Sequence, residues 1–203
     1  MDLLLSLNDR SIYLVSQGPP AVYYILDHKA GGILINAPAF SPAVWGALQD
    51  LGGTRFLFLP SHFGVRDLAL WRAAGVQVLA FQEEVATVSA TDVDVAVNSQ
   101  QKLTRTIDFL PMAGRTHGTC GLRLKNLPGV LFLGPALTPG LSRWPELIAH
   151  PDDYSYESRL MGVFGLRDLA FDYVFTDLFV PGETAFGPGA DRAIRAHLDA
   201  LLA

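Results

Sequence analysis

The hydrophobic pattern of the first third of the chain consists of short apolar runs separated by turn residues. Residues 11–15, 22–26 and 32–35 are rich in β-branched, aromatic and aliphatic side chains, which favour strands. Turn-forming residues at positions 18–20 and 29–31 mark tight connections between these runs. The pattern predicts an antiparallel meander.

The next segment alternates between helical and strand patterns. Ser41 suits an N-cap, and Pro42 suits the first helical position because its missing N–H would have no partner there. A continuous apolar run at residues 56–59 predicts a strand buried on both faces. The patterns at residues 68–75 and 76–81 predict a helix and a further buried strand. Strand–helix–strand order implies parallel pairing through right-handed crossovers.

The second half repeats this logic, and no shift in composition marks a linker. Its helical spacing predicts one helix within residues 154–169 and another with an apolar stripe of Ile194, Leu198 and Leu201. We interpret Asp152 and Asp153 as the entry to the first of these helices, where the helix dipole favours negative charge. Apolar runs predict four further strands, at residues 105–110, 121–125, 130–133 and 172–176.

Composition indicates one globular domain over residues 1–203. Half of the residues are hydrophobic and 17% are charged, which suits a well-buried domain and argues against disorder. The low charge also predicts that some apolar surface is covered by a second copy, as in a homodimer. The net charge of −5, without blocks of one sign, provides no basic patch of the kind that binds nucleic acid, so we expect no nucleic-acid partner.

The N-terminus and the cysteine content bear on location. Residues 1–7 are apolar but have no basic start and no small-residue cleavage site, so we predict no signal peptide. No run approaches the roughly 20 apolar residues of a membrane-spanning helix, and we expect no membrane association. The single cysteine, Cys120, excludes an internal disulfide and fits a reducing compartment, which predicts cytoplasmic residence.

Cys120 lies at the head of a predicted strand, so we expect it to be a small buried residue rather than a nucleophile.

The stretch LPSHFGVRDL at residues 59–68 joins a predicted strand to a predicted helix. In this context it resembles the H-x-H-x-D-H loop of the metallo-β-lactamase-fold hydrolases, which helps to hold two metal ions. His62 matches the first histidine of that loop. Gly64, Arg66 and Asp67 stand at the second histidine, the aspartate and the third histidine.

Four other segments resemble landmarks of the same family, in the same order, so that the resemblance covers most of the chain. A strand that ends in an acidic residue in the family ends here in Asn36. AGRTHGT resembles P-G-H-T-x-G-S, with Arg115 at the metal-binding histidine. LFLGPAL resembles L-F-x-G-D-x-L, with Pro135 at the aspartate that bridges the metals. The last histidine of the family aligns near Leu178, beside Asp177.

The resemblance implies an α+β fold, a four-layer α/β/β/α sandwich, but not a working metal centre. A catalytic zinc takes three protein ligands and a water, whereas His62 alone is retained and Asp67 is its only potential companion. Arg66 and Arg115 place fixed positive charge at ligand positions, and a guanidinium cannot ligate a metal.

The leading hypothesis is that the chain has lost the dinuclear centre and the hydrolase activity. It would then need no cofactor and would bind a small anionic ligand or a protein partner. The candidate site residues are His62 and Asp67 as vestigial catalytic residues, and Arg66, Arg115, His117 and Asp177 as ligand-binding residues.

Purely structural interpretations compete at three of these positions. Arg115 is favoured as a structural cation paired with Asp67 or Asp177, because a buried carboxylate without a cation is costly. His62 is favoured as a relic hydrogen-bonded to nearby backbone or to Asp67, since a base is assigned by geometry before pKa. Arg66 begins a predicted helix and is expected to face water.

Two alternative functions stay open. The first is a hydrolase with a rebuilt site, in which a single zinc sits among His62, Asp67, His117 and Asp177, or in which chemistry runs without a metal. The resemblance then implies ester, thioester, amide or phosphoester bonds as substrates. The second is a structural subunit that forms a stable homo-oligomer, which the high apolar fraction suits.

Overall fold

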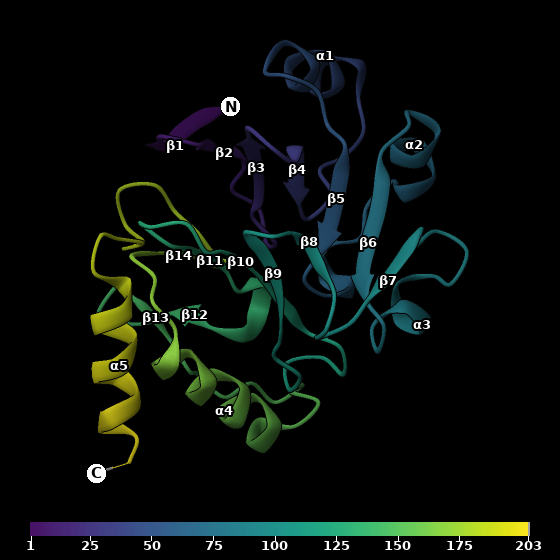
Figure 1. Ribbon diagram of the computed structural model, residues 1–203. Coiled ribbons are helices and arrows are strands. Elements are labelled where there is room, and N and C mark those ends of the chain that lie inside the picture. Colours follow the sequence, from purple (N-terminus) through teal and green to yellow (C-terminus); the bar gives the residue numbers. More distant parts are fainter. Residues whose placement is uncertain (203) are drawn as a thin grey trace. The chain divides into compact units, whose positions relative to one another are not determined.

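The computed structural model describes residues 1–202 of the chain. Two compact units, Met1–Val97 and Asn98–Ala203, divide it, and each contains its own main sheet (Figure 1). None of the helices in the described residues is long and apolar enough to cross a membrane.

The first unit is built on a seven-stranded sheet whose strands follow one another in chain order. The first four strands pair antiparallel, and the fourth to the seventh pair parallel. The predicted meander and the predicted parallel pairing are therefore confirmed. The strands are β1 (Asp2–Leu7), β2 (Arg10–Ser16), β3 (Val22–Asp27), β4 (Gly31–Ile35), β5 (Phe56–Leu59), β6 (Gln77–Phe81) and β7 (Val95–Val97).

Three helices, α1 (Pro42–Asp50), α2 (Leu68–Ala73) and α3 (Val85–Val88), share one hydrophobic core with alternate residues of this sheet. α1 begins as predicted, because the Ser41 Oγ accepts a hydrogen bond from the backbone N–H of Val44 (3.2 Å). Trp71 of α2 is fully buried in this core, where its indole N–H donates to the carbonyl of Pro38 (3.0 Å). The other core residues include Tyr24, Leu34, Leu48, Leu57 and Val78.

The second unit contains a five-stranded sheet in the order β14-β11-β10-β9-β8 and a two-stranded sheet of β12 and β13. β11 and β14 pair parallel, and the remaining neighbours pair antiparallel. The four predicted strands are found here with small shifts at their ends. The bounds are β8 (Lys102–Thr104), β9 (Ile107–Pro111), β10 (Cys120–Leu124), β11 (Val130–Phe132), β12 (Thr138–Pro139), β13 (Pro145–Glu146) and β14 (Tyr173–Phe175).

Two helices, α4 (Tyr156–Phe164) and α5 (Ala190–Ala200), pack with this sheet around a second core. α4 is shorter than predicted, because a 3-10 turn, η3 (Gly165–Asp168), follows it directly. In α5, Ile194 and Leu198 are buried as the stripe predicts, whereas Leu201 lies at the C-cap and is 42% exposed. The other core residues include Leu131, Leu133, Val163, Leu166 and Val174.

Candidate functional site

The loop after β5 places His62 at the surface of the first unit. The Ser61 Oγ accepts a hydrogen bond from the N–H of Phe63 (3.3 Å) and so caps a 3-10 turn, η1 (His62–Gly64). The His62 Nδ1 lies 2.6 Å from the Glu84 Oε1, and the His62 backbone N–H donates to the same oxygen (2.8 Å). The Glu84 side chain is 1% exposed and that of His62 is 34% exposed. In the neutral imidazole that carries its proton on Nδ1, this nitrogen donates to the carboxylate and Nε2 is left as an acceptor.

Glu84, rather than Asp67, is thus the partner of His62, and no motif in the sequence marks it. The carboxylate of Asp67 instead accepts the N–H of Phe40 (2.9 Å). Asp67 has a positive φ of 51° at the start of α2. Arg66 is exposed, as predicted, and forms no ion pair with any described residue.

A loop at residues 112–119 carries Arg115 in the second unit. Its shape is fixed by Thr119, whose Oγ1 accepts the N–H of Thr116 (2.9 Å) and lies 2.7 Å from the Thr116 Oγ1. Gly114 has a φ of 139°, and a Cβ there would lie 2.3 Å from the backbone nitrogen of Arg159. Glycine is therefore required where this loop meets the start of α4.

Arg115 forms ion pairs with two consecutive aspartates. Its Nη2 donates to Asp152 (2.9 Å), and its Nη1 lies 3.6 Å from Asp153. The side chains of Arg115 and Asp153 are 13% and 5% exposed, whereas that of Asp152 is 67% exposed. Arg115 is therefore paired with carboxylates, as expected of a structural cation, and two of its partners are Asp152 and Asp153. Asp152 and Asp153 precede α4, as predicted, but the helix starts only after its cap, Ser155, so the two acids lie outside its first turn.

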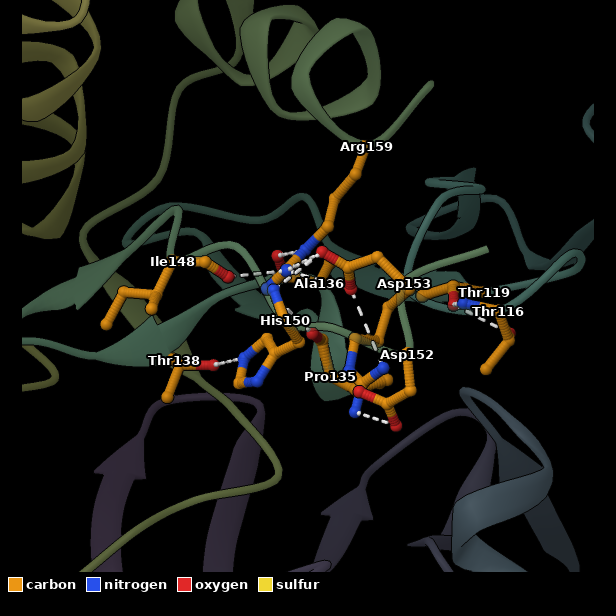
Figure 2. A network of polar contacts seen from close by, with 11 residues as sticks. Thr116, Thr119, Pro135, Ala136, Thr138, Ile148, His150, Asp152, Asp153 and Arg159 are labelled. Atoms are coloured by element: carbon orange, nitrogen blue, oxygen red, sulfur yellow. Dashed lines mark hydrogen bonds and ion pairs between the residues drawn. The ribbon is translucent and has the colours of Figure 1, made fainter. Parts of the chain in front are cut away.

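Arg159 of α4, which is not among the residues predicted from the sequence, completes this network. Its guanidinium is 0% exposed and forms an ion pair with Asp153 (3.0 Å). Figure 2 shows it reaching three backbone carbonyls, with N···O distances of 2.8 Å to Ala136, 2.7 Å to Ile148 and 3.3 Å to Pro135. By the motif resemblance, Pro135 aligns with the aspartate that bridges the metals in the family, and the Arg159 guanidinium donates to its carbonyl. One feature of the sequence could have indicated that Arg159 is buried: it lies four residues before Val163, on the same and otherwise apolar face of the helix.

Burial, hydrogen bonds and charges in this network shift the pKa values of its members. The hydrogen bond from Arg115 lowers the pKa of Asp152. Burial lowers the pKa of Arg159, although the charge of Asp153 opposes the shift. Burial, followed by the charges of Arg115 and Arg159, lowers the pKa of His150 from 6.5. The His150 ring, 3.4 Å from the Thr138 Oγ1, therefore favours its neutral form beside two cations.

The remaining predicted residues have other surroundings. His117 is exposed, and its ring lies 4.9 Å from that of Tyr154. Asp177 is buried, and its backbone N–H donates to the carbonyl of Gly134 (2.9 Å). Leu178 is 43% exposed. Cys120 is fully buried in β10, as predicted.

The donor set does not fit a dinuclear metal centre. Within residues 1–202, no three histidine, cysteine, aspartate or glutamate side chains converge as a metal site would require. The residues that the motif resemblance aligns with the family's ligands are a guanidinium (Arg115), a proline (Pro135) and an apolar side chain (Leu178), and none of these can ligate a metal.

Comparison with solved structures decides the fold. A metallo-β-lactamase from Pontibacter korlensis superposes with a TM-score of 0.71 at 12% identity, over 99% of this chain and 98% of that one. A subclass B3 metallo-β-lactamase from Bradyrhizobium japonicum gives a TM-score of 0.66 at 16% identity, over 98% and 91% of the two chains. The chain has the metallo-β-lactamase fold.

Other solved structures agree. A metallo-β-lactamase family protein from Thermus thermophilus gives a TM-score of 0.64 at 15% identity, over 94% of this chain and 79% of that one. The predicted α+β class and metallo-β-lactamase-like fold are confirmed. No protein-family model matches the sequence, and no curated protein matches it. Identities this low establish the fold alone.

Proposed function

We propose that this metallo-β-lactamase-fold protein has replaced the dinuclear metal centre with an arginine–aspartate network and binds a small anionic ligand at Arg115. The observation that carries this proposal is the position of Arg159. Its guanidinium donates to the carbonyls of Pro135 and Ala136 (3.3 and 2.8 Å), in the loop where the family has its bridging aspartate. A permanent cation of the protein's own thereby takes the place of a bound cation.

The same donor set argues against metal-assisted hydrolysis. Lewis-acid polarisation and a metal-activated water both need a metal held by several ligands. Arginine at position 115 repels a metal cation rather than ligating it, and Pro135 brings no carboxylate.

Arg115 differs from Arg159 in a way that favours ligand binding. Arg159 is fully buried and its guanidinium is bound by backbone carbonyls and Asp153. Arg115 is 13% exposed, and its Nη2 contacts the exposed Asp152. A guanidinium binds carboxylate or phosphate oxygens through paired N–H groups, so Arg115 is suited to an anionic ligand that arrives from solvent.

Metal content tests the first half of the proposal. Protein purified without a histidine tag or added metal should contain well below one equivalent of zinc or iron by elemental analysis. A content near one equivalent would contradict the proposal and make His62, Asp67, His117 and Asp177 the ligands to mutate.

Ligand screening tests the second half. A panel of small carboxylates and phosphate esters is titrated into the protein and followed by ¹H–¹⁵N NMR. Binding should be lost in Arg115→Met and kept in Arg66→Met, which removes an exposed arginine that forms no ion pair with a described residue. Absence of binding, or binding that survives in R115M, would contradict an anion site at Arg115.

A second candidate function rests on the His62–Glu84 pair. An imidazole whose Nδ1–H is held by a buried carboxylate can accept a proton at Nε2, which is the arrangement of a general base. Such a base contributes roughly 10²- to 10⁴-fold to the rate of a hydrolysis. This candidate is a metal-free hydrolase of esters or related bonds, the substrate class implied by the family resemblance.

Activity measurements separate this candidate from the first. Hydrolysis of p-nitrophenyl acetate that resists EDTA should disappear in His62→Ala and fall in Glu84→Gln, while His28→Ala, at an exposed histidine of the same unit, should leave it unchanged. Hydrolysis that survives in H62A would rule out His62 as the base.

A further inference from the structure

The two aspartates that contact Arg115 are held very differently. Asp153 is 5% exposed, contacts both arginines, and accepts the backbone N–H of His150 (3.0 Å). Asp152 is 67% exposed, and the side-chain hydrogen bond found for it comes from Arg115 (2.9 Å). One carboxylate is therefore built into the turn at residues 150–153, and the other is largely exposed.

We propose that the Asp152 carboxylate occupies the ligand position on Arg115. Asp152 must then leave Arg115 before a small carboxylate can bind there. This proposal rests on the proposed function and adds to it a ligand class and an autoinhibitory contact. The ligand takes over the hydrogen bond from the Arg115 Nη2. Asp153 stays in place and keeps the guanidinium oriented from its other side.

The energetics allow such an exchange. Ion pairs that involve a largely exposed partner are weak, and a displaced Asp152 regains hydration at the surface. Arg159 and Asp153 are not exchangeable in this way, because removing either from its partner would leave a buried charge unpaired. The exchange therefore involves the rim of the network and leaves its buried part intact.

The surroundings favour a carboxylate attached to an aromatic ring. The backbone N–H of Ser155 donates to the carbonyl of Gly114 (3.0 Å), which places the segment after Asp153 beside the Arg115 loop. Tyr154, which directly precedes Ser155, and His117, two residues after Arg115, form an exposed ring pair with centroids 4.9 Å apart. An aromatic ring bound there would stack on them while its carboxylate meets Arg115. Benzoate is the simplest probe of this chemistry.

The first experiment measures benzoate affinity by NMR titration in four proteins. Asp152→Asn removes the competing charge and should tighten binding about 2- to 5-fold over the natural protein, as expected for loss of a weak exposed ion pair. Glu157→Gln removes another acidic side chain of the same segment, which accepts a hydrogen bond from the Ser155 Oγ instead (3.3 Å), and should leave the affinity unchanged. Arg115→Met should abolish binding.

The second experiment follows Asp152 itself. Its pKa is lowered in the free protein, chiefly by the hydrogen bond from Arg115. Carboxyl ¹³C titration with saturating benzoate should return this pKa toward the ordinary aspartate value, because the ligand has taken the hydrogen bond. This shift distinguishes displacement of Asp152 from a general effect of its charge: if the D152N change acted only through the net charge, benzoate would leave the hydrogen bond to Asp152, and so its pKa, unchanged.

The outcomes separate this inference from the proposed function. If benzoate binds through Arg115 but D152N binds no more tightly than E157Q, or the pKa of Asp152 does not move, the autoinhibitory contact is wrong and the anion site stands. If benzoate binds to neither the natural protein nor D152N, the aromatic carboxylate is the wrong ligand class and the inference fails. The wider anion panel then decides the proposed function.

Discussion

The side-chain oxygen of Asn36 occupies the space that any side chain on Gly64 would need: a Cβ at residue 64 would lie 2.0 Å from the Asn36 Oδ1. Asn36 is fully buried and held by its Nδ2 hydrogen bond to the carbonyl of Ala21 (2.9 Å). The backbone of the two segments is also joined, because the N–H of Ala37 donates to the carbonyl of Gly64 (2.9 Å). Asn36 and the loop at Gly64 are therefore packed against each other, and no space is left for a side chain at residue 64.

Restoring the second histidine alone should fail for that reason. Gly64→His is expected to destabilise the protein by about 1–3 kcal/mol, as overpacking of a filled interior does, and to bind no additional zinc. Urea unfolding and elemental analysis measure the two effects. A stable G64H variant that takes up zinc would show that the loop is still able to accommodate a metal ligand.

A double-mutant cycle isolates the contact. Gly64→Ala should destabilise the natural protein, but much less in the background of Asn36→Gly, which removes the amide and tolerates the positive φ of 63° at residue 36. The coupling energy should be about 0.5–3 kcal/mol in favour of the double variant. Strictly additive effects would mean that Asn36 and Gly64 do not restrict one another.

The main elements of the fold were predictable because their signals are local. Ser41 and Pro42 mark the start of α1, and the apolar run of β5 is buried along its whole length. β1 was not predicted because its side chains are mostly exposed or half-buried, so that no clear alternation reveals its inner face. β7 and β8 have only three residues each, too few for a periodic pattern.

The site was predictable only in part, because its partners are distant in sequence. The loss of metal ligands at Arg115 and Pro135 was visible in the motifs. Asp152 lies 37 residues after Arg115, and Glu84 lies 22 residues after His62. Nothing local to either residue identifies these carboxylates, which only the folded chain brings to their partners.

The buried guanidinium of Arg159 should be essential for the stability of the second unit. Arg159→Met leaves Asp153 short of a partner and the carbonyls of Ala136 and Ile148 without their donor. Loss of one member of a buried ion pair typically costs about 3–5 kcal/mol, and we expect a loss of that size in urea unfolding. Arg159→Met combined with Asp153→Asn should recover part of it, because the second change removes the uncompensated charge.

Arg167 provides the matched control for this prediction. It pairs with Asp199 at 2.8 Å, but both side chains are largely exposed. Arg167→Met should therefore change the stability by no more than about 1 kcal/mol. If R159M were as mild as R167M, the network would not be the structural replacement for a metal centre.

His150 should report the positive charge of the network through its pKa. Partial burial, then the charges of Arg115 and Arg159, lower the pKa of His150 below 6.5. Because the folded protein resists protonation of this imidazole, stability is lost as the pH falls below 6.5 and the unfolded chain gains a proton. Removing one cation in Arg115→Met should raise the pKa of His150, as measured by NMR titration of its ring protons. An unchanged midpoint in R115M would show that Arg115 does not act on His150.

Tyr24 should give the first unit a loss of stability at high pH. Its hydroxyl is buried and donates to the carbonyl of Gly53 (2.6 Å). Burial, aided by the charge of Tyr13, raises the pKa of Tyr24 from 10.0 to about 12. The folded state thus holds the proton more tightly than the unfolded chain, so this contribution is complete below pH 10 and is lost as the pH rises through 12.

Comparison with Tyr24→Phe separates this effect from other groups that titrate at high pH. Near neutral pH the variant should be less stable by about 1 kcal/mol, because the Gly53 carbonyl loses its donor. At about pH 11 the natural protein should lose roughly 1.4 kcal/mol relative to the variant, because the unfolded tyrosine is largely ionised there and the folded one is not. Tyr154→Phe, at a ring that is 60% exposed, should remove none of this dependence. Equal pH profiles for the natural protein and Y24F would mean that Tyr24 ionises as readily in the folded chain as in the unfolded one.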